Sequence, residues 1–570
     1  MADENALTLP FIDLRSTDTA IVGGKNASLG EMIASLSETG IAVPGGFATT
    51  SRAYREFLRH NHLDGAIADV IGAMNEGNLP ESGTKIRRMF DKAKFPPQLE
   101  QEIRESYRQL GNGDRISVAV RSSATAEDLP AASFAGQQET FLNIRGEETL
   151  LDACRKCYAS LFTDRAISYR ENQGFDHLEV ALSIGIQHMV RSDLGAAGVM
   201  FSIDTETGFA EAVLINASWG LGELVVQGSV DPDEYRVFKP LLDNPQLRPV
   251  LERRLGNKSN KMIYADEGDE PTRTISTKES ERSAFVLTDT EAMQLARWAV
   301  VIERHYDRPM DIEWAKDGET GKLWVVQARP ETVQSQRGTQ MLKNYTLKNR
   351  GRELVRGLSV GDAIAAGKVC KLASPDEIGQ FEEGAILVTP MTDPDWVPVM
   401  KKAAAIVTDH GGRTSHAAIV SRELGLPAVV GTGNASQILK PGQEVTVSCA
   451  EGDVGFIYEG EADFEARDLA LENIPKTKTA IMLNLANPSA ALQWWRLPAD
   501  GVGLARMEFI INNLIKVHPM ALVEPDRVTD EKVRQAIAHL TRAFDDPKDY
   551  FVETLARGVS LIAASRWPNP

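Results

Sequence analysis

Several residue types are scarce in this sequence, and each scarcity excludes a class of protein. Among 570 residues there are only four cysteines, too few for a disulfide framework. Aromatic residues make up 6% of the chain. Lys plus Arg number 62 against 80 Asp plus Glu, so the net charge of −18 argues against nucleic acid or a membrane as partner. No apolar run approaches the ~18 residues of a membrane helix, and the N-terminus lacks a secretory signal. We therefore expect a soluble, cytoplasmic protein.

The four cysteines are expected to be buried thiols. Cys154 and Cys157 have C-x-x-C spacing, but they lie in LLDACRKCYASLF, whose pattern predicts an amphipathic helix. Cys370 and Cys449 are isolated and supply no second pair of metal ligands. Because free cysteine is among the most buried residue types, structural packing is the simpler interpretation.

The length and composition are those of a multidomain globular chain of roughly three to four domains. Residues 1 to about 335 alternate helical patterns with short apolar strands and end in a hairpin. The polar stretch 334–354 and the acidic stretch 459–479 are interpreted as linkers on either side of a compact block at about 355–460. A third block begins at about 478.

Two glycine-rich segments do not match the common nucleotide-binding fingerprints. The segment Gly23-Gly24-Lys25 lacks both the earlier glycine and the following Ser or Thr of a Walker A loop. The segment Gly220-Leu221-Gly222 lacks the third glycine of a dinucleotide-binding turn. Lys25 therefore lies in a glycine turn that begins a helix, and by itself a solvated lysine is the ordinary interpretation.

A predicted hairpin at 310–330 places acidic and basic side chains together. In MDIEWA, Asp311 and Glu313 share one face of a strand, and the returning strand LWVVQAR brings Gln327 and Arg329 beside them. Two carboxylates next to an amide and a guanidinium suit Mg²⁺ that also binds nucleotide phosphates. Periodicity alone leaves a second interpretation open, the solvated face of an edge hairpin.

One of the nine histidines stands in a distinctive setting, HGGRTSHAAIVSREL. Thr414 and Ser415 are good N-cap residues, and Gly425 is expected to end the helix that follows. His416 would then lie in the first helical turn, where free backbone N–H groups stabilise a phosphoryl anion. A neutral imidazole is a nucleophile near pH 7. An isolated histidine at such a position is more often bonded to its own loop.

Taken together, these motifs resemble the phosphoenolpyruvate synthase and pyruvate phosphate dikinase family. The matching segments follow the family's order: GGKNASLGEM, VPGGFATT, VRSSATAEDLPAASFAGQQET, QHMV, GVMFS, WGLGE, DIEWA, VVQARP, MTDPDWVPVMKKA and GGRTSHAA. The resemblance implies a multidomain α/β (α+β) chain with an ATP-grasp-like domain at 1–345. A swivelling phosphohistidine domain would follow at 346–475. Residues 476–570 would begin a (β/α)8 barrel that binds phosphoenolpyruvate or pyruvate.

The resemblance assigns ATP-binding roles to residues across the first domain: Lys25, Arg121, Gly136, Thr140, Gln187, Glu313, Gln327 and Arg329. Lys25 and Arg121 would contact the phosphates, Arg121 also in catalysis, and Gly136 and Thr140 would lie in a phosphate-covering loop. Gln187 would lie near the adenine. The last three would lie at the metal-triphosphate end, with Glu313 as the ligand of Mg²⁺. We add Asp311 as a second metal ligand on strand geometry alone.

Outside that domain the resemblance assigns three further roles. His416 would carry the phosphoryl group, Arg506 would bind pyruvate, and Thr414 would be a position for regulatory phosphorylation by a separate kinase. His410, which lies in the glycine loop, is expected to have no such role. A homo-oligomer is also expected.

The implied reaction converts ATP, pyruvate and water into AMP, phosphate and phosphoenolpyruvate through phosphorylated His416. The segment MTDPDW resembles the synthase branch more than the dikinase branch. From 478 to 570 there are 93 residues, whereas a (β/α)8 barrel needs ~200–250. We therefore expect a C-terminally truncated chain that is competent only for the ATP half-reaction. Another phosphohistidine phosphotransferase and a non-catalytic ATP-binding fragment stay open as alternatives.

Overall fold

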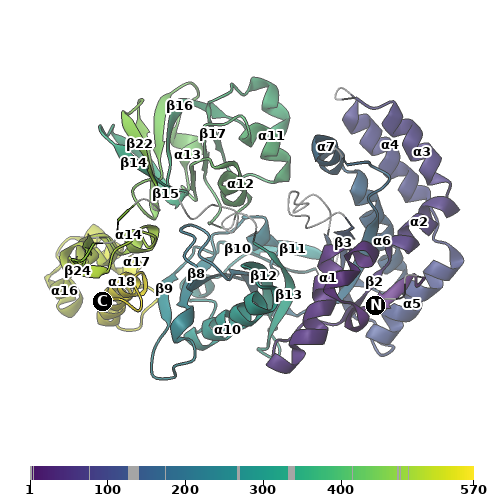
Figure 1. Ribbon diagram of the computed structural model, residues 1–570, viewed down its shortest axis with the longest axis horizontal. Coiled ribbons are helices and arrows are strands. Elements are labelled where there is room, and N and C mark those ends of the chain that lie inside the picture. Colours follow the sequence, from purple (N-terminus) through teal and green to yellow (C-terminus); the bar gives the residue numbers. More distant parts are fainter. Residues whose placement is uncertain are drawn as a thin grey trace. The chain divides into compact units, whose positions relative to one another are not determined.

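The computed structural model describes residues 3, 5–75, 78–125, 140–173, 175–265, 270–331, 341–413, 415–470, 474–475, 477–485 and 487–570. The chain divides into two compact units, and each unit is described by itself. Figure 1 labels the helices and strands. The first unit contains 1–197, 262–275 and 311–330, and the second contains 198–261, 276–310 and 331–570.

A five-stranded sheet in the order β1-β2-β5-β3-β4 forms the centre of the first unit. Each neighbouring pair in it is antiparallel. Its strands are β1 (Thr8–Pro10), β2 (Gly46–Thr49), β3 (Ser117–Ala124), β4 (Thr140–Arg145) and β5 (Leu182–His188). β5 is buried along six of its seven residues, as expected of a strand with neighbours on both sides.

Helices surround this sheet: α1 (Thr19–Leu36), α2 (Ser51–His60), α3 (Leu63–Gly72), α4 (Leu79–Lys92), α5 (Pro97–Leu110), α6 (Glu147–Ala159) and α7 (Asp164–Gln173). Their apolar faces form one core with β3 and β5. Ring contacts among Phe57, Phe90, Phe95 and Tyr158 link three of its elements. Cys154 and Cys157 are fully buried in this core, so the prediction of structural thiols on a helix is confirmed for both.

The glycine turn before Lys25 is a kink inside α1. Gly23 has φ +73, and an ideal Cβ there would lie 2.3 Å from the backbone oxygen of Ser123 on β3. A side chain at position 23 would therefore push α1 away from the sheet. Ser28 also ties α1 to the hairpin, because its hydroxyl donates to the backbone oxygen of Ala328 at 2.7 Å.

The hairpin predicted at 310–330 is confirmed as β12 (Met310–Lys316) and β13 (Leu323–Pro330), which are neighbours in one sheet. Along β12, Met310, Ile312 and Trp314 are buried, while Asp311 and Glu313 are partly exposed. The two carboxylates therefore share a face, as the period-2 alternation indicated.

In the second unit, β6 (Ala196–Phe201), β7 (Ala212–Trp219), β8 (Asp233–Phe238) and β9 (Val250–Arg254) follow one another in a sheet. Helix α10 (Asp289–Tyr306) packs on β7, β8 and β9. A capping box begins α10, in which Thr288 accepts from the backbone N of Glu291 and Glu291 accepts in return. Shorter elements of this unit are α8 (Glu223–Val226) and α9 (Glu279–Arg282), whereas most residues of β10 (Asn260–Tyr264) and β11 (Thr272–Ser276) belong to the first unit.

A closed seven-stranded barrel follows, in the order β15-β19-β18-β17-β16-β20-β21. Its strands are β15 (Glu353–Val360), β16 (Ile364–Lys371), β17 (Ile386–Thr389), β18 (Ala405–Thr408), β19 (Ala428–Val430), β20 (Glu444–Ser448) and β21 (Val454–Glu459). Its core contains branched aliphatic side chains such as Ile386, Val407 and Val447. A second cluster packs α11 (Val397–Met400) and α12 (His416–Leu424) against the strands. The short helix α13 (Ala435–Ile438) completes this block.

Both flanking stretches that were interpreted as linkers contain a strand. Residues of the two stretches form β14 (Met341–Leu347) and β22 (Phe464–Ala470), which pair antiparallel over seven positions and lie side by side in Figure 1. Each stretch is polar and lacks an apolar face, so its strand signal is weak. The pairing appears when the barrel brings both ends of the block together. The stem formed by β14 and β22 is therefore tertiary in origin.

The last block begins with two parallel strands, β23 (Met482–Leu485) and β24 (Gly501–Ala505). Its helices are α14 (Pro488–Gln493), α15 (Met507–Ile510), α16 (Pro519–Val523), α17 (Glu531–Thr541) and α18 (Pro547–Ala564). Strand β24 ends at Ala505, and α15 begins two residues later at Met507. Among the described residues, no helix is long and apolar enough to span a lipid bilayer.

Candidate functional site

A narrow cavity in the first unit gathers four of the residues predicted to bind ATP. Lys25, Arg121, Gln187 and Gln327 all line it. They come from α1, β3, β5 and β13, so the elements that meet there are far apart in the sequence. Gln187 and Gln327 are each 3% exposed, and such buried amides need hydrogen-bond partners. The Gln187 Nε2 donates to the backbone oxygen of Val326 at 3.4 Å.

Arg121 is the centre of the polar contacts in this cavity. Its Nη2 donates to Oε2 of Glu313 at 3.1 Å and also to Oε1 of Gln327. Its Nη1 donates to the backbone oxygen of Val326 at 3.4 Å. Both side chains of the Arg121–Glu313 pair are about one-fifth exposed, so the guanidinium is held in place and still meets the cavity. A planar cation fixed in this way suits phosphate oxygens.

The other predicted carboxylate, Asp311, is paired inside the hairpin. Arg329 approaches its Oδ2 with Nε at 2.9 Å and with Nη2 at 2.8 Å. Asp311 and Glu313 thus share one face of β12, and each faces a different arginine. Among the described residues, no group of three or more His, Cys, Asp or Glu side chains could hold a metal ion.

Two further residues predicted for the phosphate end have different outcomes. Thr140 begins β4, and its Cα is paired with that of Arg121 on β3, so it lies directly beside the cation. The side chain of Thr140 is exposed. Gly136 lies outside the described residues. Lys25 donates from Nζ to the backbone oxygen of Ser122 at 3.3 Å, which places its ammonium group next to the same strand.

A second candidate centre surrounds His416, the first residue of α12. The N-cap is Ser415, whose hydroxyl accepts from the backbone N of Ala418, and Gly425 ends the helix with φ +69. The predicted bounds and caps of this helix are therefore confirmed, except that Thr414 lies outside the described residues. His410 is exposed in the loop before it, and its backbone N donates to the oxygen of Pro390.

The ring of His416 is oriented by Thr392. The Oγ1 of Thr392 lies 3.0 Å from Nδ1 of His416, and Thr392 is 3% exposed. Burial lowers the pKa of His416 from 6.5 to about 4, so the imidazole is neutral at pH 7. This hydrogen bond occupies Nδ1, so the other ring nitrogen, Nε2, is the one left to react. Sequence reasoning missed Thr392, although it belongs to the MTDPDW segment.

Comparison with known proteins adds to this geometry. Residues 19–349 match the pyruvate phosphate dikinase AMP/ATP-binding domain, and 381–452 match the mobile domain of PEP-utilising enzymes. A phosphoenolpyruvate synthase of Synechocystis sp. is 50% identical over 586 residues, covering 100% of this chain and 71% of that protein. Proteins of the same name from Pseudomonas aeruginosa and Escherichia coli K12 are 51% and 49% identical. These alignments cover 97% and 99% of this chain, and 70% and 71% of the relatives.

The chain belongs to the phosphoenolpyruvate synthase family. Lys25 and Arg121 of the cavity lie within the range matched by the family's AMP/ATP-binding domain, and His416 lies within the range matched by its mobile domain. The mixed α/β, multidomain architecture expected from the sequence is likewise that of the family.

Four residues that line this cavity were missed: Phe11, Asn26, Leu29 and Gly185. Leu29 follows Lys25 by four positions, so the 3.6-residue period of a helix predicts that the two share a face. Asn26 adjoins the lysine and donates to the hydroxyl of Ser183 at 2.9 Å. Phe11 precedes the first helix, and no local pattern relates it to the other residues of the cavity.

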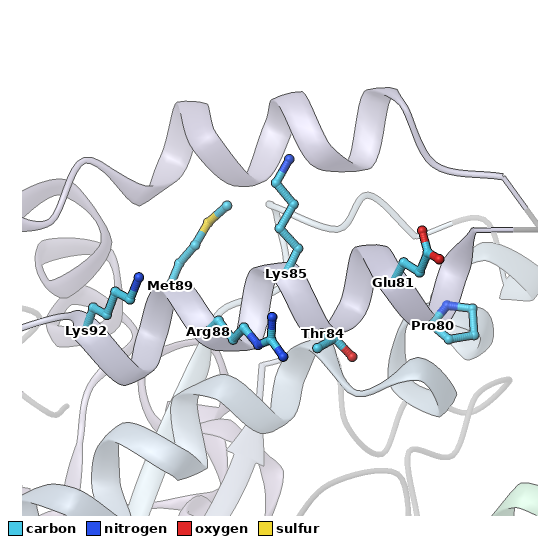
Figure 2. Close-up of a pocket in the computed structure, with 7 residues that line it drawn as sticks. All are labelled: Pro80, Glu81, Thr84, Lys85, Arg88, Met89 and Lys92. Carbon is cyan, nitrogen blue, oxygen red and sulfur yellow. The ribbon is translucent and has the colours of Figure 1, made fainter.

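A wider groove of about 610 Å³ runs along α4, as Figure 2 shows, and contains none of the predicted residues. Its lining is Pro80, Glu81, Thr84, Lys85, Arg88, Met89 and Lys92. Arg506, predicted to bind pyruvate, is exposed just after β24, where it is the N-cap of α15. It directly follows the C-terminal end of strand β24.

Proposed function

We propose that this chain transfers a phosphoryl group from ATP to His416 and from His416 to pyruvate, forming phosphoenolpyruvate. The observation that supports this most directly is His416 itself, a neutral imidazole at a helix start with Nδ1 hydrogen-bonded to Thr392. The cavity with the cations Lys25 and Arg121 would bind the phosphoryl donor, ATP.

At the nucleotide end, Lys25 and Arg121 would bind the triphosphate. Leu29 and Phe11 would contact the base or ribose through their apolar surfaces, with Gln187 near the adenine. Thr140, beside Arg121, would contact the phosphates together with Gly136. The finer fold assignments belong to this proposal as well: an ATP-grasp-like nucleotide domain, and β23 and β24 as the first strands of a (β/α)8 barrel with Arg506 at a strand end.

The residues present fit a magnesium ion bound together with the nucleotide. Mg²⁺ takes oxygen ligands and commonly uses one or two protein carboxylates plus phosphate oxygens. Glu313 would be the main ligand, and Asp311 the second, on the same face of β12. When bound, the ion neutralises phosphate charge. Arg121 and Arg329 neutralise the same carboxylates when no nucleotide is present.

The proposed chemistry requires the tautomer in which Nδ1–H donates to Oγ1 of Thr392, because the lone pair is then on Nε2. Nε2 attacks the β-phosphorus of ATP, the bond to the α–β bridging oxygen breaks, and AMP leaves with that oxygen. Water then releases the terminal phosphate from the pyrophosphoryl-histidine and leaves phosphohistidine. In the second half, the enolate oxygen of pyruvate attacks this phosphorus, the N–P bond breaks, and a proton is lost from the methyl group. The free N–H groups at the start of α12 stabilise the phosphoryl anion.

Pyruvate phosphate dikinase chemistry is the second candidate, because the matched domain at 19–349 has that name. The two differ in what accepts the terminal phosphoryl group: water gives phosphate, whereas inorganic phosphate gives pyrophosphate. Incubation with ATP, Mg²⁺ and pyruvate, followed by phosphorus NMR, separates them. We expect equal amounts of AMP, phosphate and phosphoenolpyruvate without added phosphate. Pyrophosphate that forms only when phosphate is added would support the dikinase, and no nucleotide turnover would contradict both.

A further inference from the structure

The segment that carries His416 contacts a part of the chain that lies in the other matched family range. Residues 411–422 lie in the mobile-domain range, and residues 206–234 lie in the range of the AMP/ATP-binding domain. Both segments are in the second unit. Three contacts join them, and they involve Arg413, Ser415 and Arg422 of the histidine segment.

Arg413, three residues before His416, forms the first contact. Its Nη1 donates to Oε1 of Glu234 on β8 at 3.1 Å, and its Nη2 donates to Oδ1 of Asp453 at 2.6 Å. The side chains of Arg413 and Glu234 are 3% and 2% exposed, so both charges are out of water. Removing one partner of such a pair leaves the other charge unpaired in a low-dielectric interior. The pair therefore holds the histidine loop to the sheet.

Arg422, two turns along α12, forms the second contact. It pairs with Glu206 in the loop between β6 and β7, and its Nη2 also donates to the backbone oxygen of Arg413 at 2.5 Å. The second carboxylate oxygen of Glu206 accepts from the backbone N of Gly361 at 3.3 Å. Glu206 thus binds the barrel at two places that are distant in its sequence.

The third contact is a close backbone approach at Gly228, which has φ +69. An ideal Cβ at this position would lie 2.3 Å from Cβ of Ser415 and 3.2 Å from the backbone N of His416. Any side chain there would separate the start of α12 from this surface. The absence of a side chain at Gly228 therefore lets the first turn of the histidine helix sit against the β7–β8 segment.

The receiving carboxylates also have contacts within their own part of the chain. Asp204 accepts from the backbone N atoms of Glu206 and Thr207 and binds Nε of Arg236 at 2.7 Å, which fixes the loop that presents Glu206. Burial by itself would raise the pKa of Glu234, but the cations of Arg413, Arg254 and Arg236 hold it below its ordinary value. Glu206 is therefore presented by a hydrogen-bonded loop, and Glu234 is ionised at neutral pH.

We propose that Glu234 and Glu206 are positioning residues that dock the phosphohistidine domain on the ATP-binding domain through Arg413 and Arg422. The docked arrangement is the one in which His416 is loaded from ATP. Neither glutamate touches the nucleotide in this account. They act on the loop and helix that hold His416. The proposal rests on the proposed function for its kinetic consequence, and on geometry alone for the docking itself.

The kinetic test separates binding of ATP from phosphorylation of His416. We expect Glu234→Gln and Glu206→Gln each to slow acid-labile labelling from β-labelled ATP by about tenfold in a single turnover, because each removes a carboxylate that pairs with a buried arginine. The dissociation constant for ATP should change by less than about twofold, since the variants leave the cavity intact. The matched control is Glu281→Gln, which removes the partly buried pair with Lys261 elsewhere in the same matched range and should label at the wild-type rate.

A charge exchange tests whether the pair acts across the domains. Glu206→Arg alone should label more slowly than Glu206→Gln, because two cations then face each other. Adding Arg422→Glu should recover part of the lost rate. If the double variant is no faster than Glu206→Arg, or if both Gln variants label at the wild-type rate, the proposal is wrong.

The distance test does not depend on phosphoryl transfer. Spin labels at Asp243 and Lys440, both exposed, report the separation of the two domains in a Cys370→Ser background, since the other three cysteines are buried. We expect one narrow distance distribution in the wild type and Glu281→Gln, and a broad one in Glu234→Gln plus Glu206→Gln. Identical distributions in all proteins would overturn the proposal. If the wild type takes no label from ATP, the proposed function fails and the distance result still decides the docking.

Discussion

Arg121 of β3 donates a hydrogen bond from Nη2 to Oε2 of Glu313 on β12 at 3.1 Å, across 192 positions of the sequence. Arg121 lines the cavity that we assign to ATP. The pair explains how a chain with a net charge of −18 offers a cation to an anionic nucleotide. Arg121 is fixed by Glu313 and Gln327, so a phosphate meets a guanidinium that is already oriented.

The first prediction concerns this arginine. Arg121→Gln should raise the dissociation constant for ATP about tenfold or more, because a hydrogen bond between charged groups contributes ~1.5–3 kcal/mol. Calorimetric titration with a non-hydrolysable ATP analogue measures it. Arg87→Gln, which breaks the ion pair with Asp164 in the same unit, is the matched control. Equal affinities in the two variants would contradict the assignment of Arg121.

The second prediction separates the two carboxylates of β12. Glu313→Gln should raise the Mg²⁺ concentration needed for half-maximal His416 labelling by about tenfold, since a carboxylate ligand is lost. Asp311→Asn should have a smaller effect, because Asp311 binds Arg329 through two nitrogens. Labelling rates across a Mg²⁺ titration give both values. A larger effect of Asp311→Asn would reverse the assigned ligands.

The third prediction concerns the hydroxyl that orients the imidazole. Thr392→Val keeps the shape of the side chain and removes the partner of Nδ1, so labelling of His416 should slow by about tenfold. Thr392→Ser should recover most of the rate, and the ATP concentration for half-maximal labelling should be the same in all three proteins. A Thr392→Val protein with the wild-type rate would show that the tautomer is set elsewhere.

The parts of this fold that sequence patterns predicted are those with strong local signals. The period-2 alternation of MDIEWA predicted that Asp311 and Glu313 share a face, and the caps Ser415 and Gly425 predicted both ends of α12. The stem of β14 and β22 was interpreted as linkers, because polar strands have no apolar period and their pairing depends on the closed barrel. Local patterns also cannot predict which residues distant in the sequence come into contact in the folded chain.

The candidate site divides in the same way. Lys25 and Arg121 were assigned through family motifs, whereas Phe11 and Thr392 reach their sites by long-range packing that no local pattern encodes. Gly136 and Thr414 lie outside the described residues and stay predictions.

The fourth prediction is the titration of His416. Burial lowers its pKa from 6.5 to about 4, so the folded chain binds the proton more weakly than the unfolded chain does. The contribution of this group to stability is therefore complete above pH 6.5 and is lost as the pH falls toward 4. Nitrogen-15 NMR of selectively labelled histidines follows the midpoint, and the spectrum of His416→Gln identifies the resonance. A midpoint at or above 6.5 would contradict the burial of the ring.

The central claim is that His416 carries the phosphoryl group, and one labelling experiment tests it most directly. Wild type and His416→Ala are incubated with Mg²⁺ and β-labelled ATP without pyruvate, and protein-bound label is measured before and after brief acid treatment. The account predicts up to one label per wild-type chain, lost in acid and retained in base, and no label on His416→Ala. Equal labelling of the two proteins, or no label on either, would contradict it.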